Sequence, residues 1–288
     1  MSGFVFRAYD QAELDRQMNA RGTVPDIAPF VAAYASESAR CRADLTCDIG
    51  VKYGPRHEER LDVFPAAGKR KAPVYVFIHG GYWRLLDASD SSFMARALTG
   101  AGACVVAINY GLAPATPLRE IVRQCAAAMG WVAANIARYG GDPDNIHVSG
   151  SSAGGHLAAM MLSETWQAIG GVPRGAIRSA SPLSGLHDLV PVQLSHCNGW
   201  LALDPAEALA LSPMQNLPVL PVPQVVAYAP NETEEFKRQS EVYAAASAAL
   251  GAKIEVLVEP GTNHFDLPLK LMDQNSALFA ATARLMGL

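Results

Sequence analysis

A serine between two glycines is the first candidate for chemistry in this chain: Gly150–Gly154 reads GSSAG and matches the pattern G-x-S-x-G. With 24 glycines in 288 residues, a chance match is expected in about one chain in ten, so the pattern alone is weak. Its context is stronger, because the strand-like run IHVS precedes it and an Ala-rich helical run follows it. In a sharp turn from strand to helix, Ser152 would present its hydroxyl as a nucleophile.

Ser152 is the serine to which the pattern assigns this role, because the two glycines lie symmetrically about it and not about Ser151. Glycines are needed at these positions because side chains would clash in so tight a turn. The other interpretation of Ser152 is a helix N-cap, a position that serine also favours. A base, an acid and a glycine-rich loop elsewhere in the chain favour the nucleophile.

The glycine-rich loop is HGGYW, residues 79–83, which directly follows the apolar run PVYVFI. Lipases and esterases with a G-x-S-x-G serine carry such a loop at this place, and each amide aimed at the developing oxyanion contributes about 3 kcal/mol. We expect the amides of Gly81, Tyr82 and Ala153 to form the oxyanion hole. We further expect Tyr82 and Trp83 to contact the substrate. The alternative is an ordinary turn with a core aromatic pair, which applies above all to Trp83.

The base is expected at His264, in the segment GTNHFD that follows the strand-like run KIEVLV. Chain order in such sites is serine, acid, histidine, so the acid should follow the run QVVAYA. Glu232 is the first candidate, and its carboxylate would hold the imidazole tautomer and stabilise the imidazolium. Glu234 and Glu235 remain alternatives, although acids in a first helical turn also interact with the helix dipole. Asp266 lies too close to His264 in sequence to be preferred.

No motif for a metal or a nucleotide cofactor is present, so none is expected. The five cysteines have irregular spacings that fit neither a disulfide framework nor a zinc site, which favours free thiols in a reducing compartment. We expect the other six histidines to be structural or exposed: His57, His79, His147, His156, His187 and His196.

Composition excludes several classes of protein. Half of the residues are hydrophobic and 17% are charged, which predicts a large buried core. The net charge of -4 provides no basic surface for nucleic acid or for a membrane. The N-terminus has no apolar signal-peptide region, and we therefore expect a cytoplasmic location. The expected partner is a small-molecule substrate, and a homodimer is left open.

Strand-like and helical segments alternate along the chain, which predicts a mostly parallel sheet with helices on both faces. We treat residues 1–288 as one domain, with an N-terminal arm over about 1–45 and a cap insertion over about 190–221. Strands are expected at 61–64, 73–79, 104–110, 146–149, 176–181, 224–229 and 253–258. Helices are expected at 91–99, at 117–139, from 153, at 234–250 and from about 267, and in the arm with interruptions at Pro25 and Pro29.

Taken together, the segments HGGYW, GGDPDNIHVSGSSAGGHLA, SGLHDL, EFKRQS and NHFD resemble the kynurenine formamidases of the α/β-hydrolase fold. They are also similar to the wider hormone-sensitive-lipase-like esterases, and the resemblance spans about residues 50–280. It implies Ser152 as nucleophile, Glu232 as acid and His264 as base, with Gly81 and Tyr82 in the oxyanion hole. In these relatives the acid is often Asp, and a His is common at the position of Ser151.

The resemblance implies hydrolysis of N-formyl-L-kynurenine to L-kynurenine and formate, without a metal, through an acyl-enzyme. A carboxylesterase for short acyl or aryl esters would use the same residues, and fold and site alone do not separate the two activities. The third interpretation, a non-catalytic binding protein, is disfavoured because all the expected catalytic residues are present.

Overall fold

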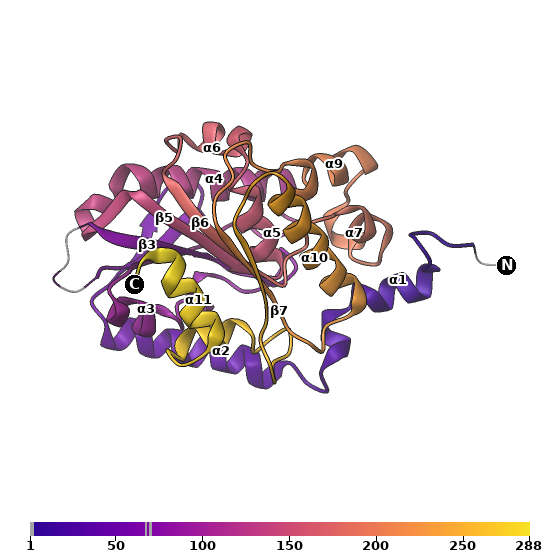
Figure 1. The fold of residues 1–288 in the computed structure, drawn as a ribbon, viewed down its shortest axis with the longest axis horizontal. Coiled ribbons are helices and arrows are strands. Elements are labelled where there is room, and N and C mark those ends of the chain that lie inside the picture. Colours follow the sequence, from indigo (N-terminus) through magenta and orange to yellow (C-terminus); the bar gives the residue numbers. More distant parts are fainter. Residues whose placement is uncertain (1–2, 67, 69–70) are drawn as a thin grey trace.

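The computed structural model describes residues 3–66, 68 and 71–288, which are organised around a central sheet (Figure 1). In this part of the chain the sheet has eight strands in the spatial order β1-β2-β4-β3-β5-β6-β7-β8. The strands are β1 Asp48–Lys52, β2 Arg60–Phe64, β3 Ala72–Ile78, β4 Cys104–Ile108, β5 Gly141–Ser151, β6 Ile177–Leu183, β7 Gln224–Tyr228 and β8 Ile254–Val258.

Strands β3 to β8 pair in parallel, whereas β2 is antiparallel to both β1 and β4. The mostly parallel sheet expected from the sequence is therefore confirmed. The edge strand β1 was not expected, since its sequence DIGVK is short and none of its residues is buried. Because β3 and β5 to β8 point the same way, the loops after them meet at one edge of the sheet.

Helices cover both faces of the sheet (Figure 1). One face carries α4 Leu118–Asn135, α5 Ala153–Met160 and α10 Glu234–Ala249. The other carries α2 Ala28–Asp44, α3 Ala95–Ala101 and α11 Ala277–Met286. The sequence of β3 is continuously apolar because both faces of this strand are buried. Val74, Val76 and Ile78 pack with the first group of helices, and Tyr75 and Phe77 pack with the second.

The remaining helices are short and lie in connections. They are α1 Gln11–Gln17, η1 Ala20–Thr23, η2 Ala88–Asp90, η3 Ile136–Tyr139, α6 Glu164–Gly170, α7 Val190–Leu194, α8 Asn198–Leu201, α9 Pro205–Ala210, η4 Pro213–Gln215 and η5 Pro268–Met272. Within residues 190–221, expected to form a cap insertion, the chain folds into the short helices α7, α8, α9 and η4. Among the described residues, no helix is long and apolar enough to cross a membrane.

Three expected helix boundaries were wrong. Pro29 does not interrupt a helix, because it lies in the first turn of α2, where its missing amide hydrogen is not needed. The final helix does not begin near residue 267: a 3-10 turn is followed by extended Asp273, and the Ser276 side chain then caps α11 by accepting from the Phe279 amide. Likewise, α3 begins at Ala95 rather than at Ser91.

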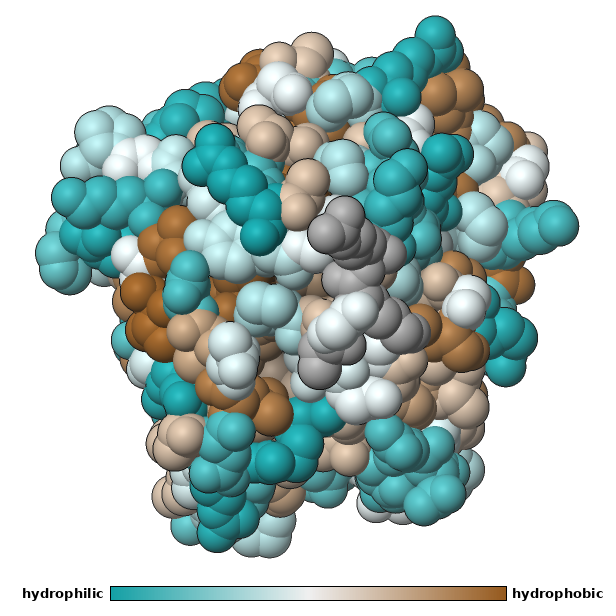
Figure 2. Space-filling model, turned by 90° about the vertical axis from the view of Figure 1, so that its left-hand side faces the viewer, coloured by the Kyte–Doolittle hydropathy of each residue, from teal (hydrophilic) through white to brown (hydrophobic). Residues whose placement is uncertain are grey.

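The face of the molecule beside the start of β3 carries mainly hydrophilic side chains, with hydrophobic ones in separate groups between them (Figure 2). This face lies at the end of the sheet where the parallel strands begin. A ligand site is expected at the opposite end, beyond the carboxyl ends of those strands.

Several buried histidines make the stability of the fold sensitive to acid. Burial lowers the pKa of His187 to about 3. It lowers the pKa of three others to about 4: His79, His147 and His156. In the unfolded chain a histidine titrates near 6.5, so the unfolded state binds more protons between pH 6.5 and about 4. The free energy of unfolding should therefore fall as the pH drops through this window, and this contribution is fully present above it.

We expect the variant His187→Phe to lose less stability between pH 7 and pH 4.5 than the wild type. The imidazole stacks on Tyr243 with 3.9 Å between ring centroids, and neither ring nitrogen has a hydrogen-bond partner among the described residues. A phenyl ring keeps the stack and cannot titrate. Chemical denaturation at both pH values measures the difference, and His57→Phe, at an exposed position, serves as control. Equal acid sensitivity of His187→Phe and the wild type would contradict the argument.

Candidate active site

Ser152 occupies a strained turn between β5 and α5, with φ 59° and ψ -119°. The turn is compact because α5 starts directly against the end of β3. A Cβ on Gly150 would lie 2.3 Å from the Gly154 carbonyl oxygen, and one on Gly154 would lie 2.0 Å from that of Ile78. Both glycines of the G-x-S-x-G pattern are thus required by close backbone approach. The Ser152 amide donates to the Leu183 carbonyl at 2.8 Å, which fixes the turn over the sheet.

The glycine-rich loop after β3 lies against this turn. A Cβ on Gly80 would come within 2.6 Å of the Ser151 carbonyl oxygen and 3.4 Å of the Ser152 Cβ. Gly81 and Tyr82 both have positive φ, at 93° and 51°. Among the described residues, the amides of Gly81 and Tyr82 have no hydrogen-bond acceptor. They are therefore available to an oxyanion.

The amide of Ala153, the third expected donor, belongs to the first residue of α5. The first amides of a helix have no intrahelical acceptor, and they lie at the positive end of the helix dipole. The sequence-predicted donors thus meet at the junction of two loops. An anion beside Ser152 would face amides from both.

Neighbouring elements hold the glycine-rich loop in place. The His79 ring stacks on Tyr110 with centroids 4.0 Å apart, and the Tyr110 hydroxyl donates to the His79 carbonyl at 2.8 Å. The Tyr82 hydroxyl donates to the Met18 carbonyl, which belongs to the N-terminal arm. In the cap, the Trp200 indole donates to the Tyr82 carbonyl at 3.1 Å. The arm therefore holds the side chain of Tyr82, and the cap holds its backbone carbonyl.

The expectation that Trp83 contacts the substrate is wrong. Its side chain is 0% exposed and does not line the cavity beside Ser152. Its indole Nε1 donates to His156 Nδ1 at 3.2 Å, so the proton of that neutral ring is on Nε2, which donates to the Leu211 carbonyl at 2.8 Å. The Trp83 ring points into the core. It holds the glycine-rich loop against α5 and, through His156, against the cap.

His264 and Glu232 face each other in the loops after β8 and β7. His264 Nδ1 lies 3.5 Å from Glu232 Oε2, and both side chains are almost fully buried. Neither of these two atoms has a hydrogen-bond partner among the described residues. The separation is slightly longer than a hydrogen bond, as is common for catalytic pairs without substrate. The arrangement allows the carboxylate to accept the Nδ1 proton and leaves Nε2 to act as a base.

The other oxygen of Glu232 is held by two donors. Ser184 Oγ donates to Oε1 at 2.5 Å and the Ala229 amide at 2.9 Å. Ser184 directly follows β6 and has a positive φ of 48°. Sequence reasoning gave it no role, although it stands in the SGLHDL segment and follows a strand in the same way as the other site residues. Its hydroxyl orients the carboxylate toward His264.

The alternative acids have other partners. Glu235 is buried, but both of its oxygens accept from the Arg238 guanidinium, at 2.8 and 2.6 Å. The side chain of Glu234 is 74% exposed and pairs with Lys237 at 2.6 Å. Asp266 accepts from the amide and the side chain of Asn263. None of the three faces the His264 ring nitrogens, so Glu232 is the acid that the geometry favours.

A cavity of about 480 Å³ opens over Ser152 and His264, a size that suits a small organic molecule. The glycine-rich loop forms its floor with Gly80, Gly81 and Tyr82. Much of the wall comes from the arm, with Met18, Ile27, Val31 and Tyr34, and from the cap, with His196 and Trp200. Aromatic side chains from other segments add to it: Phe77, Phe93 and Phe265. The expected contact of Tyr82 with a substrate is consistent with this lining.

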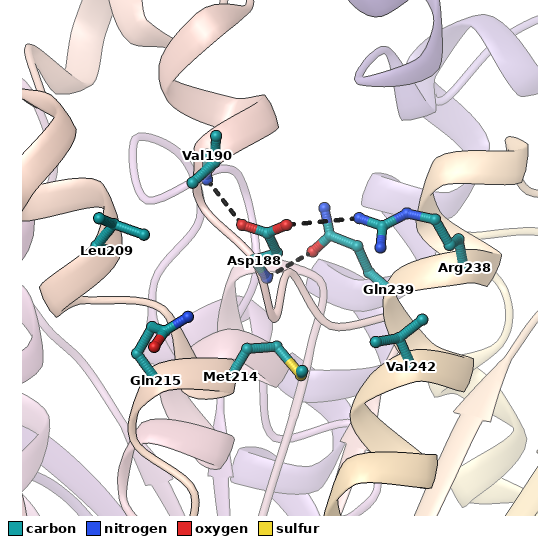
Figure 3. Close-up of a pocket in the computed structure, with 8 residues that line it drawn as sticks. All are labelled: Asp188, Val190, Leu209, Met214, Gln215, Arg238, Gln239 and Val242. Carbon is teal, nitrogen blue, oxygen red and sulfur yellow. Dashed lines mark hydrogen bonds and ion pairs between the residues drawn. The ribbon is translucent and has the colours of Figure 1, made fainter. Parts of the chain in front are cut away.

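A second, smaller cavity of about 210 Å³ lies between the cap and α10 (Figure 3). Its centre holds an ion pair between Asp188 and Arg238, at 3.6 Å, and Gln239 accepts from the Asp188 amide at 2.9 Å. These contacts tie the loop after β6 to α10. Within the described residues, no group of three His, Cys, Asp or Glu side chains is arranged to hold a metal ion.

The sheet and the loops at its carboxyl edge define a hydrolase of the α/β-hydrolase fold. A protein from Silicibacter sp. TM1040, assigned as a thioesterase, superposes with a TM-score of 0.82 at 28% identity, over 94% of this chain and 99% of its own. The family model described as BD-FAE matches residues 61–169.

Two curated relatives match almost the whole chain. A kynurenine formamidase from Danio rerio is 33% identical over 91% of this chain and 89% of its own length. One from Salmo salar is 31% identical over 98% of this chain and 95% of its own. The chain belongs to the kynurenine formamidase family, as the sequence motifs indicated.

Proposed function

We propose that this chain hydrolyses N-formyl-L-kynurenine to L-kynurenine and formate, with Ser152, His264 and Glu232 as a catalytic triad. The observation that carries the proposal is the buried pair of Glu232 Oε2 and His264 Nδ1, whose histidine lines the same cavity as Ser152. The nearly full-length similarity to kynurenine formamidases supports the substrate.

In the first half of the reaction, His264 Nε2 accepts the proton of the Ser152 hydroxyl while Oγ bonds to the formyl carbon. The negative charge on the former carbonyl oxygen is stabilised by the amides of Gly81, Tyr82 and Ala153. His264 then gives the proton to the aryl nitrogen, the C–N bond breaks, and L-kynurenine leaves.

In the second half, a water molecule takes the place of the aryl amine. His264 accepts one of its protons while the oxygen attacks the formyl-enzyme, and the bond to Ser152 Oγ breaks with return of the proton. Formate is released. The Glu232 carboxylate accepts from Nδ1 and stabilises the imidazolium that forms in each half.

A second candidate function is hydrolysis of short acyl or aryl esters. It uses the same residues, and the similarity to a protein assigned as a thioesterase favours it. The apolar and aromatic wall of the cavity would accept such substrates as well. We also propose a cytoplasmic location, because all five cysteines are free thiols, as in proteins of reducing compartments.

The two activities are separated by their catalytic efficiencies. We expect kcat/KM for N-formyl-L-kynurenine to exceed that for p-nitrophenyl acetate and p-nitrophenyl butyrate by at least about tenfold. Kynurenine release and p-nitrophenol release are followed by absorbance with the same enzyme preparation. Efficient ester turnover with a negligible formamide rate would instead make the chain a general esterase.

A further inference from the structure

Two arginines stand out in the wall of the active-site cavity. Arg21 comes from η1 in the N-terminal arm, and Arg84 directly follows the glycine-rich loop. No Asp or Glu is among the described residues that line the cavity. This bias is unusual in a chain with 27 acidic and 23 basic residues. The cavity should therefore attract an anion.

Neither guanidinium has an ion-pair or hydrogen-bond partner among the described residues. Other arginines of this chain behave differently: Arg238 pairs with Glu235 and Asp188, and Arg123 with Glu59 and Glu120. His196 also lines the cavity, but its Nδ1 lies 3.5 Å from an Asp15 oxygen, so a charge on it would already be compensated. The two arginines are the cations that remain available to a ligand.

The guanidinium of Arg84 is also oriented. It lies over the Trp200 ring, 4.5 Å from the centroid, and the same indole donates to the Tyr82 carbonyl. This contact restrains the guanidinium, and its N–H groups have no acceptor among the described residues. A free guanidinium edge matches a carboxylate in a bidentate manner, which a lysine ammonium does not.

We propose that Arg84, assisted by Arg21, binds a carboxylate carried by the leaving group of the substrate. The inference rests on the proposed function for the bond that is cleaved, and it adds the group by which the enzyme selects its substrate. N-formyl-L-kynurenine carries such a carboxylate on its amino-acid side chain, away from the formyl group. A neutral formanilide or a simple alkyl ester does not.

The test compares substrates that differ in this group alone. N-formyl-L-kynurenine is paired with N-formylkynuramine, the same aryl formamide without the carboxylate. 3-(4-Acetoxyphenyl)propionate is paired with 4-ethylphenyl acetate, so that the preference is also measured on esters whose leaving phenol carries the carboxylate or lacks it. For each pair, the ratio of kcat/KM for the substrate with the carboxylate to that for the substrate without it is measured in wild type, Arg84→Met, Arg84→Lys and Arg138→Met.

Arg138→Met is the matched control. Arg138 is exposed, has no ion-pair partner among the described residues, and lies in η3 before β5 begins. Strand β5 separates it from Ser152: Gly141 and Gly150 pair with Ala72 and Ile78 of β3, so these two ends of β5 lie about 20 Å apart. The variant thus removes the same charge far from the cavity.

We expect Arg84→Met to lower the ratio of kcat/KM with and without the carboxylate by roughly tenfold to a hundredfold on both pairs, mainly through KM. Arg84→Lys should restore part of the ratio, and Arg138→Met should leave it as in the wild type. If the ratio measured for Arg84→Met equalled that of the wild type, the inference would be overturned. If neither formamide is hydrolysed but Arg84→Met abolishes a preference for the anionic ester, the proposed function fails and the carboxylate site stands.

Discussion

Replacing Ser152 by alanine is expected to lower kcat by about 10⁴- to 10⁶-fold on formamide and ester substrates alike. The loss should be this large because the hydroxyl is the atom that forms the acyl-enzyme, and a water molecule in its place is neither bonded to the turn nor aligned with the base. The backbone of the turn keeps its positive φ, and alanine retains the Cβ that already fits there. The fold should therefore be preserved.

The measurement is single-turnover and steady-state hydrolysis of N-formyl-L-kynurenine and p-nitrophenyl acetate, with the melting temperature as a check on folding. Ser151→Ala is the informative companion, since Ser151 also lines the cavity and is the other serine of the motif. We expect it to cost less than about tenfold, because Ser151 is the last residue of β5 and precedes the turn that presents Ser152. If Ser151→Ala abolished activity and Ser152→Ala did not, the nucleophile would be misassigned.

The residues that sequence reasoning located share one property: their signals are local. Ser152 and the glycine-rich loop each combine a strand, a tight turn and a short motif, and backbone sterics force glycine at these turns. His264 and Glu232 follow the last two strands, so chain order alone assigns them to the same edge of the sheet. Fold and candidate triad therefore follow from the sequence without knowledge of long-range packing.

The residues that sequence reasoning missed are defined by contacts between distant segments. Ser184 acquires its role only because Glu232, 48 residues further on, turns toward it. Arg84 becomes a candidate ligand only because Trp200 of the cap stacks on it and no carboxylate approaches. Trp83 was assigned wrongly for the same reason, because its partner His156 lies 73 residues further along the chain, in α5. No local pattern distinguishes a ring that points into the cavity from one that points into the core.

The N-terminal arm also has a larger part in the site than its polar sequence indicated. The Gln17 side-chain oxygen accepts from the Glu235 amide at 3.0 Å, and the Gln17 carbonyl accepts from the Thr233 hydroxyl at 2.6 Å. These bonds hold the chain that directly follows Glu232. Together with the bond from Tyr82 to Met18, they connect the arm to both the acid and the oxyanion loop. The arm is thus part of the wall of the active site.

Replacing Glu232 by glutamine is expected to lower kcat by about 10³- to 10⁴-fold while the fold is retained. The side-chain oxygen of the glutamine must take the place of Oε1, because Ser184 Oγ and the Ala229 amide both donate there. The amide nitrogen then faces His264 Nδ1 and donates to it. An imidazole that accepts at Nδ1 carries its proton on Nε2, so it cannot take the proton of Ser152.

The matched control is Glu234→Gln. It removes the same charge two residues further along the chain, at a side chain that is exposed and pairs with Lys237. We expect this variant to retain wild-type kcat and kcat/KM. A purely structural role of Glu232 would lower the melting temperature of Glu232→Gln together with its activity. A role in selecting the tautomer would lower kcat at an unchanged melting temperature. Activity of Glu232→Gln within tenfold of the wild type would exclude Glu232 as the acid. No other described carboxylate faces His264 Nδ1, so none could replace Glu232 in the variant and account for such activity.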